Sequence, residues 1–289
     1  MVRTILKPLS VALIATCGWA LGISAEAANF NPPKHYYLAL GDSLAFGAQL
    51  GKLFQELATG TYDPSSFNTG YVDDFATRMR SVDPRLQVVN LSCPAETTAS
   101  FRGTCFFREL GFPIKVNYAG SQESAALSFL RAHPGQVSPI TIDIGLNDAQ
   151  LPCASPTFSV DPSCLHGTMP GALASVAQNL PSILSELHQA SPASEIIVMT
   201  YYNAFFGQDP TTDALIAPLN SEIASIAAAQ GDRVADAFTP FNRTGDETTT
   251  LCNLTFICTG LYDEHPTDIG YSVIAQQFWT ASGYSRLGD

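Results

Sequence analysis

The chain has 289 residues, of which 46% are hydrophobic and 14% are charged, so it is long and apolar enough for a compact globular protein with a sizeable core. Its formal net charge of −12 argues against nucleic acid and anionic membrane surfaces as binding partners. After the N-terminal segment, no apolar run approaches the roughly 18 residues needed to span a bilayer, so we expect no membrane span.

The first 27 residues have the form of a secretory signal peptide. Arg3 and Lys7 make a basic start, residues 9–23 are mostly apolar, and residues 25–27 (Ala-Glu-Ala) have the small-x-small pattern of a cleavage site. Lipidation at Cys17 is the weaker alternative, because Thr16 is a poor residue before a lipidated cysteine. We therefore expect a secreted, extracellular protein whose mature chain, residues 28–289, forms one domain and is monomeric.

Removal of the signal peptide leaves six of the seven cysteines, which fall into three close sequential pairs in loop-like segments. An even number of cysteines in an exported chain indicates disulfides. Zinc binding is the alternative, but neither a Cys-x-x-Cys pattern nor a neighbouring histidine accompanies these cysteines. We expect no metal and no cofactor, and we predict disulfides that join Cys93 to Cys105, Cys153 to Cys164 and Cys252 to Cys258.

Short apolar runs typical of buried strands alternate along the chain with segments of helical periodicity. The predicted strands are residues 36–40, 86–91, 140–145, 195–201 and 233–238, and the predicted helices are residues 70–82, 121–132, 171–189, 212–230 and 267–281. Residues 46–69 are predicted to be a long loop with at most a short helix, and Pro181 should bend or break the third helix. The alternation implies a parallel sheet with helices on both faces, joined by right-handed crossovers.

Four polar segments stand where these strands end or just before the last helix. They are Gly41-Asp42-Ser43-Leu44, residues 90–98, Gly145-Leu146-Asn147-Asp148 and Asp263-Glu264-His265-Pro266. Each segment could have only a structural role, since Asp or Ser often caps a helix and Asn-Asp often forms a turn. In a doubly wound sheet, however, the carboxyl ends of the strands lie along one edge, so all four segments can meet there.

Three of these motifs, in this order, resemble the GDSL, or SGNH, hydrolases over essentially the whole mature chain: residues 41–44, residues 145–148 and His265-Pro266. The resemblance implies a flavodoxin-like three-layer α/β/α sandwich with a central parallel sheet. It also implies ester hydrolysis, with Ser43 as the nucleophile and His265 as its general base. A serine hydroxyl is a poor nucleophile until a base takes its proton, and histidine takes and returns a proton near neutral pH.

The resemblance assigns the oxyanion hole to the side chain of Asn147 and the backbone amides of Ser43 and Ala95. The family usually has glycine at the position of Ala95, but alanine keeps the amide if the local backbone tolerates a Cβ. The family's acid usually lies three residues before the histidine, whereas Asp263 lies two before it. We predict that Asp263 orients His265; the alternative is a backbone carbonyl in that role and a Ser-His dyad.

One carboxylate and four histidines have no place among these motifs. Asp143 lies inside the predicted third strand, where a carboxylate should be paired, so we expect it to brace the site rather than react. The histidines that we expect to be surface or packing residues are His35, His133, His166 and His188.

The α/β-hydrolase fold is the rival enzyme class, because residues 41–45 nearly match its Gly-x-Ser-x-Gly motif. In that fold, however, the serine follows several strands and the acid and histidine lie well apart, so we reject it. The predicted function is a metal-independent esterase or lipase that forms an acyl-enzyme on Ser43 and acts on a small-molecule or lipid ester. The alternatives are a carbohydrate O-acetyl esterase of the same fold and a catalytically silent secreted binding protein.

Overall fold

The computed structural model describes residues 31–287, so the predicted signal peptide and Cys17 lie outside the described residues. Five parallel strands form the central sheet in the order β2-β1-β3-β4-β5. Their bounds are Tyr36–Gly41 (β1), Gln87–Asn90 (β2), Val137–Asp143 (β3), Ile196–Thr200 (β4) and Arg233–Asp236 (β5). This strand order is flavodoxin-like, and in such sheets ligands bind beyond the carboxyl ends of the strands.

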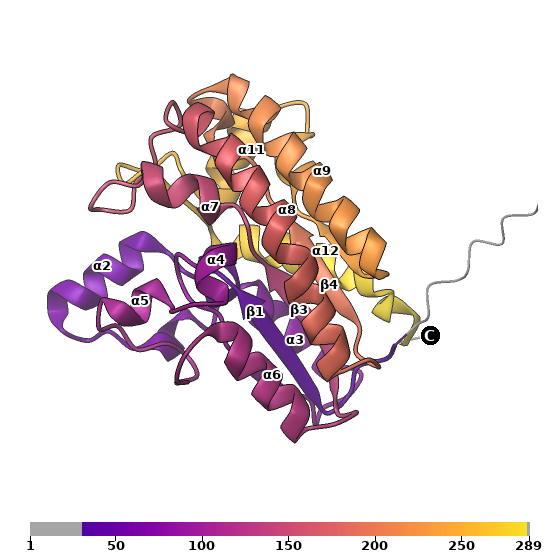
Figure 1. Cartoon of the computed structure of the whole chain (residues 1–289). Coiled ribbons are helices and arrows are strands. Elements are labelled where there is room, and N and C mark those ends of the chain that lie inside the picture. Colours follow the sequence, from indigo (N-terminus) through magenta and orange to yellow (C-terminus); the bar gives the residue numbers. More distant parts are fainter. Residues whose placement is uncertain (1–30, 288–289) are drawn as a thin grey trace, which may run out of the picture.

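Helices cover both faces of the sheet (Figure 1). On one face lie α6 (Gln122–Ala132), α8 (Leu165–Ala190) and α9 (Asp213–Gln230), and on the other lie α3 (Tyr71–Arg80) and α12 (Asp268–Ser282). Each helix buries the apolar side chains that recur every three or four residues along it. The predicted three-layer α/β/α sandwich is confirmed.

One continuous helix, α8, runs through both Pro170 and Pro181, so Pro181 does not break it. A proline inside a helix costs about 3 kcal/mol or more, because it removes a hydrogen bond and crowds the preceding turn. Burial of one large aliphatic side chain contributes about 1.5–3 kcal/mol, and four around Pro181 are fully buried. They are Leu180, Ile183, Leu184 and Leu187. Packing against the core therefore outweighs the two prolines.

Residues 46–69 contain more helix than the predicted loop with at most a short helix, because α2 spans Leu50–Thr59. Its apolar side chains recur at helical spacing, and Gly60 ends it in the left-handed conformation, with a φ of 66°. The flanking glycine, threonine and proline residues hide this pattern in the sequence. α2 matters for the site described below, because its first residue contacts the segment that carries His265.

The remaining elements are short and lie in the connections. The α-helices are α1 (Ser43–Phe46), α4 (Thr98–Phe101), α5 (Phe106–Glu109), α7 (Asn147–Gln150), α10 (Phe238–Asn242) and α11 (Glu247–Leu254). The 3-10 helices are η1 (Pro64–Phe67), η2 (Leu151–Cys153), η3 (Ala204–Gly207), η4 (Pro210–Thr212) and η5 (Tyr284–Leu287). A separate antiparallel pair joins β6 (Thr255–Phe256) to β7 (Asp263–Pro266).

A second cluster of buried apolar side chains lies apart from the main core. The helices α2 and α5, which carry part of this cluster, lie together at one side of the molecule (Figure 1). The cluster draws on α1, α2, η1 and α5 and includes the Cys93–Cys105 disulfide. The other two predicted disulfides, Cys153–Cys164 and Cys252–Cys258, are also formed. Within the part of the chain that the structure describes, no helix is both long enough and apolar enough to cross a membrane.

Candidate active site

The turn that carries Ser43 depends on the glycine before it. β1 ends at Gly41, whose φ is +129°, and a Cβ added there would lie 2.4 Å from a backbone and a side-chain oxygen of Asp143. Only glycine fits that position. Asp42 then caps α1, since the Leu44 amide donates a hydrogen bond of 2.9 Å to its Oδ1. Ser43 is thus the first residue of a short helix at the carboxyl end of the sheet, and the capping role considered for this motif is also present.

Two buried carboxyl groups lie under this turn. Asp143 accepts hydrogen bonds from the Tyr71 hydroxyl (2.6 Å) and the Ala45 amide (3.2 Å), and Asp42 accepts one from the Tyr201 hydroxyl (2.8 Å). Burial raises the pKa of both carboxyl groups, and the neighbouring charge of Asp42 raises that of Asp143 further. Asp143 is therefore paired, as a buried carboxyl must be. Its contact with the Ala45 amide braces the helix that carries Ser43.

The carboxylate of Asp263 holds the ring of His265. Both residues lie on β7, and residues two apart on a strand point to the same side, which brings Nδ1 of His265 to 2.6 Å from Oδ1 of Asp263. Since an ionised carboxylate only accepts, Nδ1 donates and Nε2 is left as the basic nitrogen of the neutral ring. The amide of Leu50, the first residue of α2, donates a bond of 2.8 Å to the other oxygen, Oδ2. The carboxylate is therefore fixed from two sides, one of them a helix N-terminus.

The electrostatic surroundings of His265 favour its charged form. Burial lowers the pKa of the imidazole, but the charge and the hydrogen bond of Asp263 outweigh burial and raise the pKa to about 9. The histidine is 6% exposed and Asp263 is 1% exposed, so water screens their interaction little. Such a histidine binds a proton readily, and the neighbouring carboxylate stabilises the imidazolium that forms.

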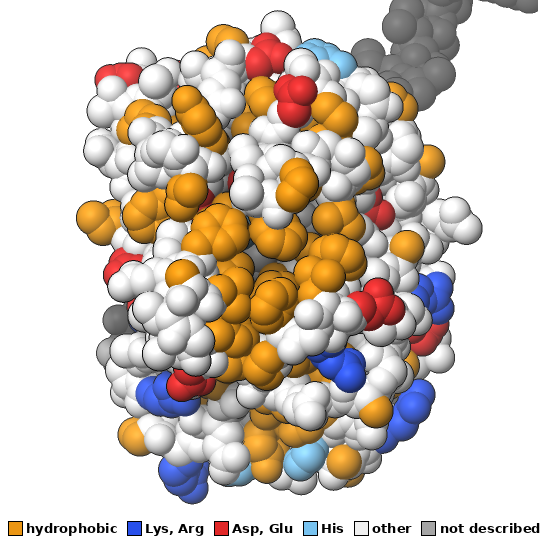
Figure 2. Space-filling model, turned by 90° about the vertical axis from the view of Figure 1, so that its left-hand side faces the viewer, with side chains coloured by type: hydrophobic (Ala, Val, Ile, Leu, Met, Phe, Trp, Pro, Cys, Tyr) orange, Lys and Arg blue, Asp and Glu red, His pale blue; other side chains and the backbone are white. Residues whose placement is uncertain are grey.

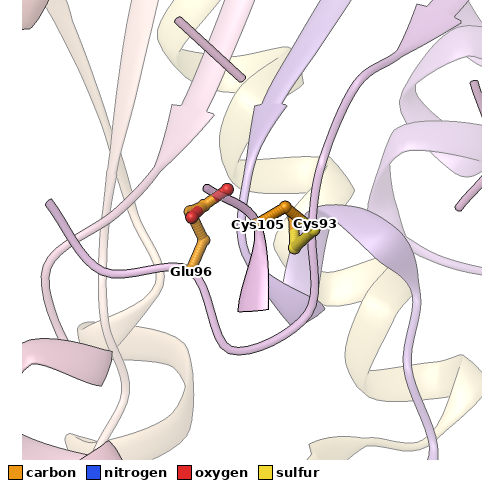
Figure 3. A group of neighbouring side chains, drawn as sticks. All are labelled: Cys93, Glu96 and Cys105. Carbon is orange, nitrogen blue, oxygen red and sulfur yellow. A yellow bond between two sulfur atoms is a disulfide. The ribbon is translucent and has the colours of Figure 1, made fainter. Parts of the chain in front are cut away.

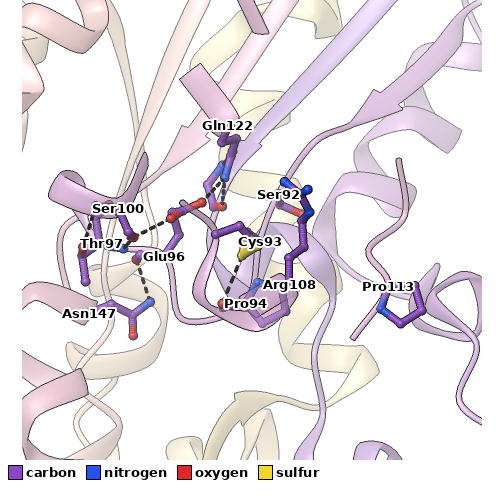
Figure 4. Close-up of a disulfide and its surroundings, with 12 residues drawn as sticks. Ser92, Cys93, Pro94, Glu96, Thr97, Ser100, Arg108, Pro113, Gln122 and Asn147 are labelled. Carbon is purple, nitrogen blue, oxygen red and sulfur yellow. Dashed lines mark hydrogen bonds between the residues drawn. A yellow bond between two sulfur atoms is a disulfide. The ribbon is translucent and has the colours of Figure 1, made fainter. Parts of the chain in front are cut away.

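A network of hydrogen bonds ties residues 93–98 to the end of β1 (Figure 4). The Gln122 side chain accepts from the Gly41 amide (2.7 Å) and donates both to the Gly41 carbonyl and to Oε2 of Glu96 (2.9 Å each). The side-chain amide of Asn147 donates to the Glu96 carbonyl at 3.1 Å. Burial raises the pKa of Glu96 to about 7. These contacts fix the loop that carries Ala95 relative to the turn that carries Ser43.

The backbone amides of Ser43 and Ala95 donate no hydrogen bond to any residue between 31 and 287. Ala95 adopts a φ of 63°, the left-handed region that glycine enters without cost. The backbone angles at Ala95 thus tolerate the Cβ, at a cost of about 1–2 kcal/mol. Asn147 keeps one of its two side-chain N–H groups for another acceptor. These three N–H groups therefore have no acceptor among the described residues.

These groups meet at a cavity of about 60 Å³ with mostly apolar walls. Figure 2 views the molecule from the side of α2 and α5 and shows apolar side chains gathered around a hollow in the surface. The polar residues that line the cavity are Ser43, Asn147, Gln150, Glu264 and His265, and its apolar walls include Phe46, Leu53, Phe67, Phe107, Phe158 and Val160. The structure therefore brings together Ser43, Ala95, Asn147 and His265 as predicted, with Asp263 behind the histidine.

The sequence model of the GDSL-like Lipase/Acylhydrolase family matches residues 39–273 of the chain. The chain belongs to this family. The predicted family and fold are therefore confirmed, and the protein is an enzyme of the lipase and acylhydrolase class.

Solved structures similar to this GDSL hydrolase include phospholipase A1 from Streptomyces albidoflavus NA297, with 19% identity, a TM-score of 0.56, and 86% of this chain and 99% of that chain covered. An extracellular lipase from Streptomyces rimosus has 20% identity, a TM-score of 0.52 and coverages of 85% and 99%. An acetylxylan esterase from Geobacillus stearothermophilus has 19% identity, a TM-score of 0.54 and coverages of 88% and 96%. At these identities the likeness concerns the fold. No curated protein matches the sequence significantly.

Among residues 31–287 of this GDSL hydrolase, two groups of side chains are close enough together to suggest metal ligands. One consists of Cys93, Glu96 and Cys105, but the two sulfurs are bonded to each other and offer no thiolate (Figure 3). The other consists of Asp263, Glu264 and His265, of which Asp263 and His265 already bond each other. Most donor atoms of both groups are thus committed to contacts within the protein.

The four histidines outside the motifs lie away from the cavity. His166 and His188 bond Asp209 and Asp232, His133 bonds a backbone carbonyl, and His35 contacts Gln87.

Three further residues belong to the GDSL hydrolase site without having been predicted from the sequence: Gln122, Gln150 and Glu264. The spacing of Gln150, one helical turn after Asn147, and the position of Glu264 beside His265 are signals that point to two of them. Gln122 lies 81 residues from Gly41, and nothing local marks it.

The Cys93–Cys105 disulfide should support both stability and activity, because it anchors the loop that carries Ala95. Replacing both cysteines by serine should lower the free energy of unfolding by about 2–3 kcal/mol, as expected for a closed loop of about this length. The Cys153–Cys164 bridge closes a loop of similar length, so its removal is the matched control for stability. Urea unfolding and ester turnover measure the two effects. Loss of activity only in step with unfolding would contradict a role for the bridge in holding the loop.

Proposed function

We propose that the protein is a secreted serine ester hydrolase that works through an acyl-enzyme. Oγ of Ser43 attacks the ester carbonyl carbon, and Nε2 of His265 takes its proton and passes it to the leaving alcohol. Water then attacks the acyl-enzyme, with the same histidine as base. The main support for the proposal is that Ser43 and His265, which is paired with Asp263, line one cavity together with N–H groups that have no acceptor among the described residues. The three disulfides and the predicted signal peptide support secretion.

The negative charge that forms on the carbonyl oxygen needs donors already in position. The backbone amides of Ser43 and Ala95 and the side-chain amide of Asn147 supply them. The network through Gln122 and Glu96 keeps these donors at fixed positions, so little reorganisation accompanies the reaction.

The apolar walls of the cavity favour a substrate with an aliphatic acyl chain over an acetylated sugar. The large aliphatic and aromatic side chains among its lining include Phe46, Leu53, Phe67, Phe107, Phe158 and Val160. Each methylene of an acyl chain that enters such surroundings gains about 0.8 kcal/mol. We therefore assign the cavity to the acyl part of the ester, which makes the protein an esterase or lipase.

A panel of p-nitrophenyl esters from acetate to palmitate tests this function. We expect kcat/KM to rise by about tenfold or more from acetate to hexanoate, because two or more methylenes become buried in the cavity. Phe158→Ala should lower kcat/KM for hexanoate more than for acetate. Phe238→Ala is the matched control, since Phe238 is half-buried but lies outside the cavity. A preference for acetate and for acetylated xylan would instead identify a carbohydrate esterase, and absence of turnover a binding protein.

Replacing Asn147 by alanine should lower kcat about 10²–10³-fold, the usual effect of removing one oxyanion donor. Steady-state kinetics measure this loss, and circular dichroism checks that the fold remains. Asn179→Ala is the control, because Asn179 donates a single hydrogen bond to Thr98 at the end of the same loop without lining the cavity. A raised KM with normal kcat in Asn147→Ala would show that Asn147 only binds substrate.

A further inference from the structure

A second, smaller cavity adjoins Ser43 on another side. Its volume is about 20 Å³, and it shares Ser43, Asn147, Gln150, Glu264 and His265 with the apolar cavity. A water molecule occupies about 10–15 Å³ by the same kind of measure, so the space suits one or two small polar groups. An ester has two substituents on opposite sides of its reacting centre. If the acyl chain fills the apolar cavity, the alcohol part lies toward this one.

Glu264 lines both cavities and carries one unsatisfied carboxyl oxygen. Its Oε2 is buried and has no hydrogen-bond partner among residues 31–287. Burial raises its pKa to about 7, although the nearby His265 opposes this rise, so near neutral pH the carboxyl can both donate and accept. The Tyr202 hydroxyl donates a 2.7 Å bond to the Glu264 backbone carbonyl and fixes this segment of β7. A buried polar group without a hydrogen-bond partner costs free energy. A ligand group that forms a hydrogen bond with this oxygen would remove that cost.

Gln150 supplies a second polar group. It lies three residues after Asn147 on α7 and lines both cavities. Its side-chain amide makes no hydrogen bond to another residue in the described part of the chain, although the residue is only 6% exposed. An amide and a neutral carboxyl, each able to donate and accept, match the hydrogen-bonding capacity of a hydroxyl group.

We propose that Gln150 and Glu264 form a subsite for a hydroxyl group on the alcohol part of the ester. The inference rests on the proposed function. The preferred substrates are then esters of polyhydroxy alcohols, such as glycerol or a sugar, and not esters of simple alkanols. Anionic alcohol parts are disfavoured by the nearby carboxyl groups of Asp42 and Asp263. A bulky cation such as trimethylammonium exceeds the space.

The test compares esters that share one acyl chain and differ only in the alcohol. For the wild type, kcat/KM for 2-hydroxyethyl hexanoate should exceed that for ethyl hexanoate roughly 5–10-fold, the worth of one or two net hydrogen bonds. Gln150→Met and Glu264→Met should each reduce this ratio about threefold or more, and the double variant should bring it close to one. Glu264→Gln should retain most of it, because glutamine still donates and accepts. Monohexanoylglycerol and 6-O-hexanoylglucose then distinguish glycerol from sugar as the source of the hydroxyl.

The ratio of the two rates distinguishes a hydroxyl subsite from a purely electrostatic role of Glu264. If Glu264 acts only through the charge of His265, Glu264→Met shifts the pH profile equally for both esters and leaves the ratio unchanged, which overturns the proposal. A ratio near one in an active wild type, or a preference for a choline ester, also overturns it. Absence of turnover on every ester refutes the proposed function itself. If Glu264→Met fails to fold, Gln150→Met carries the same test.

Discussion

Ser43→Ala and His265→Ala should each lower kcat for p-nitrophenyl hexanoate by about 10⁴-fold or more. The double variant should have a kcat little below that of either single variant. The two side chains act as a unit, since a serine without its base attacks slowly and a base without its serine has nothing to activate. Steady-state kinetics on the purified protein measure the losses. The oxyanion donors remain in both variants, so a residual rate above that of water alone is expected.

His188 provides a matched control for His265. It too bonds a carboxylate, with 2.7 Å between Nε2 and Asp232 Oδ1, but it lies outside both cavities. His188→Ala should therefore change kcat by less than about threefold, though it leaves the mostly buried Asp232 without its partner and lowers stability. Losses for Ser43→Ala and His265→Ala that add up in the double variant would contradict a shared mechanism, as would an active Ser43→Ala enzyme.

Replacing Asp263 by asparagine should lower kcat by about 10³–10⁴-fold. Asparagine can present an N–H to Nδ1 of His265, which favours the wrong tautomer, and it removes the charge that stabilises the imidazolium. It also weakens the contact with the Leu50 amide at the start of α2. A loss of about tenfold or less would show that a backbone group orients the histidine and that the enzyme works with a Ser-His dyad.

The pH dependence gives a second measurement of the same pair. His265 must be unprotonated to act as a base, and its pKa is raised to about 9 because the Asp263 carboxylate outweighs the effect of burial. We therefore expect kcat/KM to increase with pH up to about 9 in the wild type. In Asp263→Asn the charge that raises the His265 pKa is removed, and burial then lowers this pKa. The acid limb of the kcat/KM profile therefore moves to lower pH. Asp232→Asn, at the His188 pair, should leave the profile unchanged.

Several features of this protein follow from local sequence alone. The alternation of apolar runs and helical periodicity depends on residues close together in the chain, and it predicts the parallel sheet and the helices on both faces. The cysteines pair with their sequence neighbours, so their proximity is also local. Asp263 and His265 are also close in the sequence, but the strand β7, which places both side chains on one side, was not among the predicted strands.

Other features of the site depend on residues that only the packing of the whole chain brings together. The Leu50 amide that holds Asp263 lies 213 residues away from it in the chain. It belongs to a helix in a segment that was predicted from the sequence to be mostly loop. Gln122 joins Gly41 to Glu96 across 81 and 26 residues. Whether a buried glutamine or carboxyl finds a partner depends on which elements pack around it, and periodicity within one element does not carry that information. The motifs thus determined which residues could react, whereas tertiary packing decided the walls of the cavity, the bracing of the loop that carries Ala95 and the unpaired groups of Gln150 and Glu264 beside Ser43.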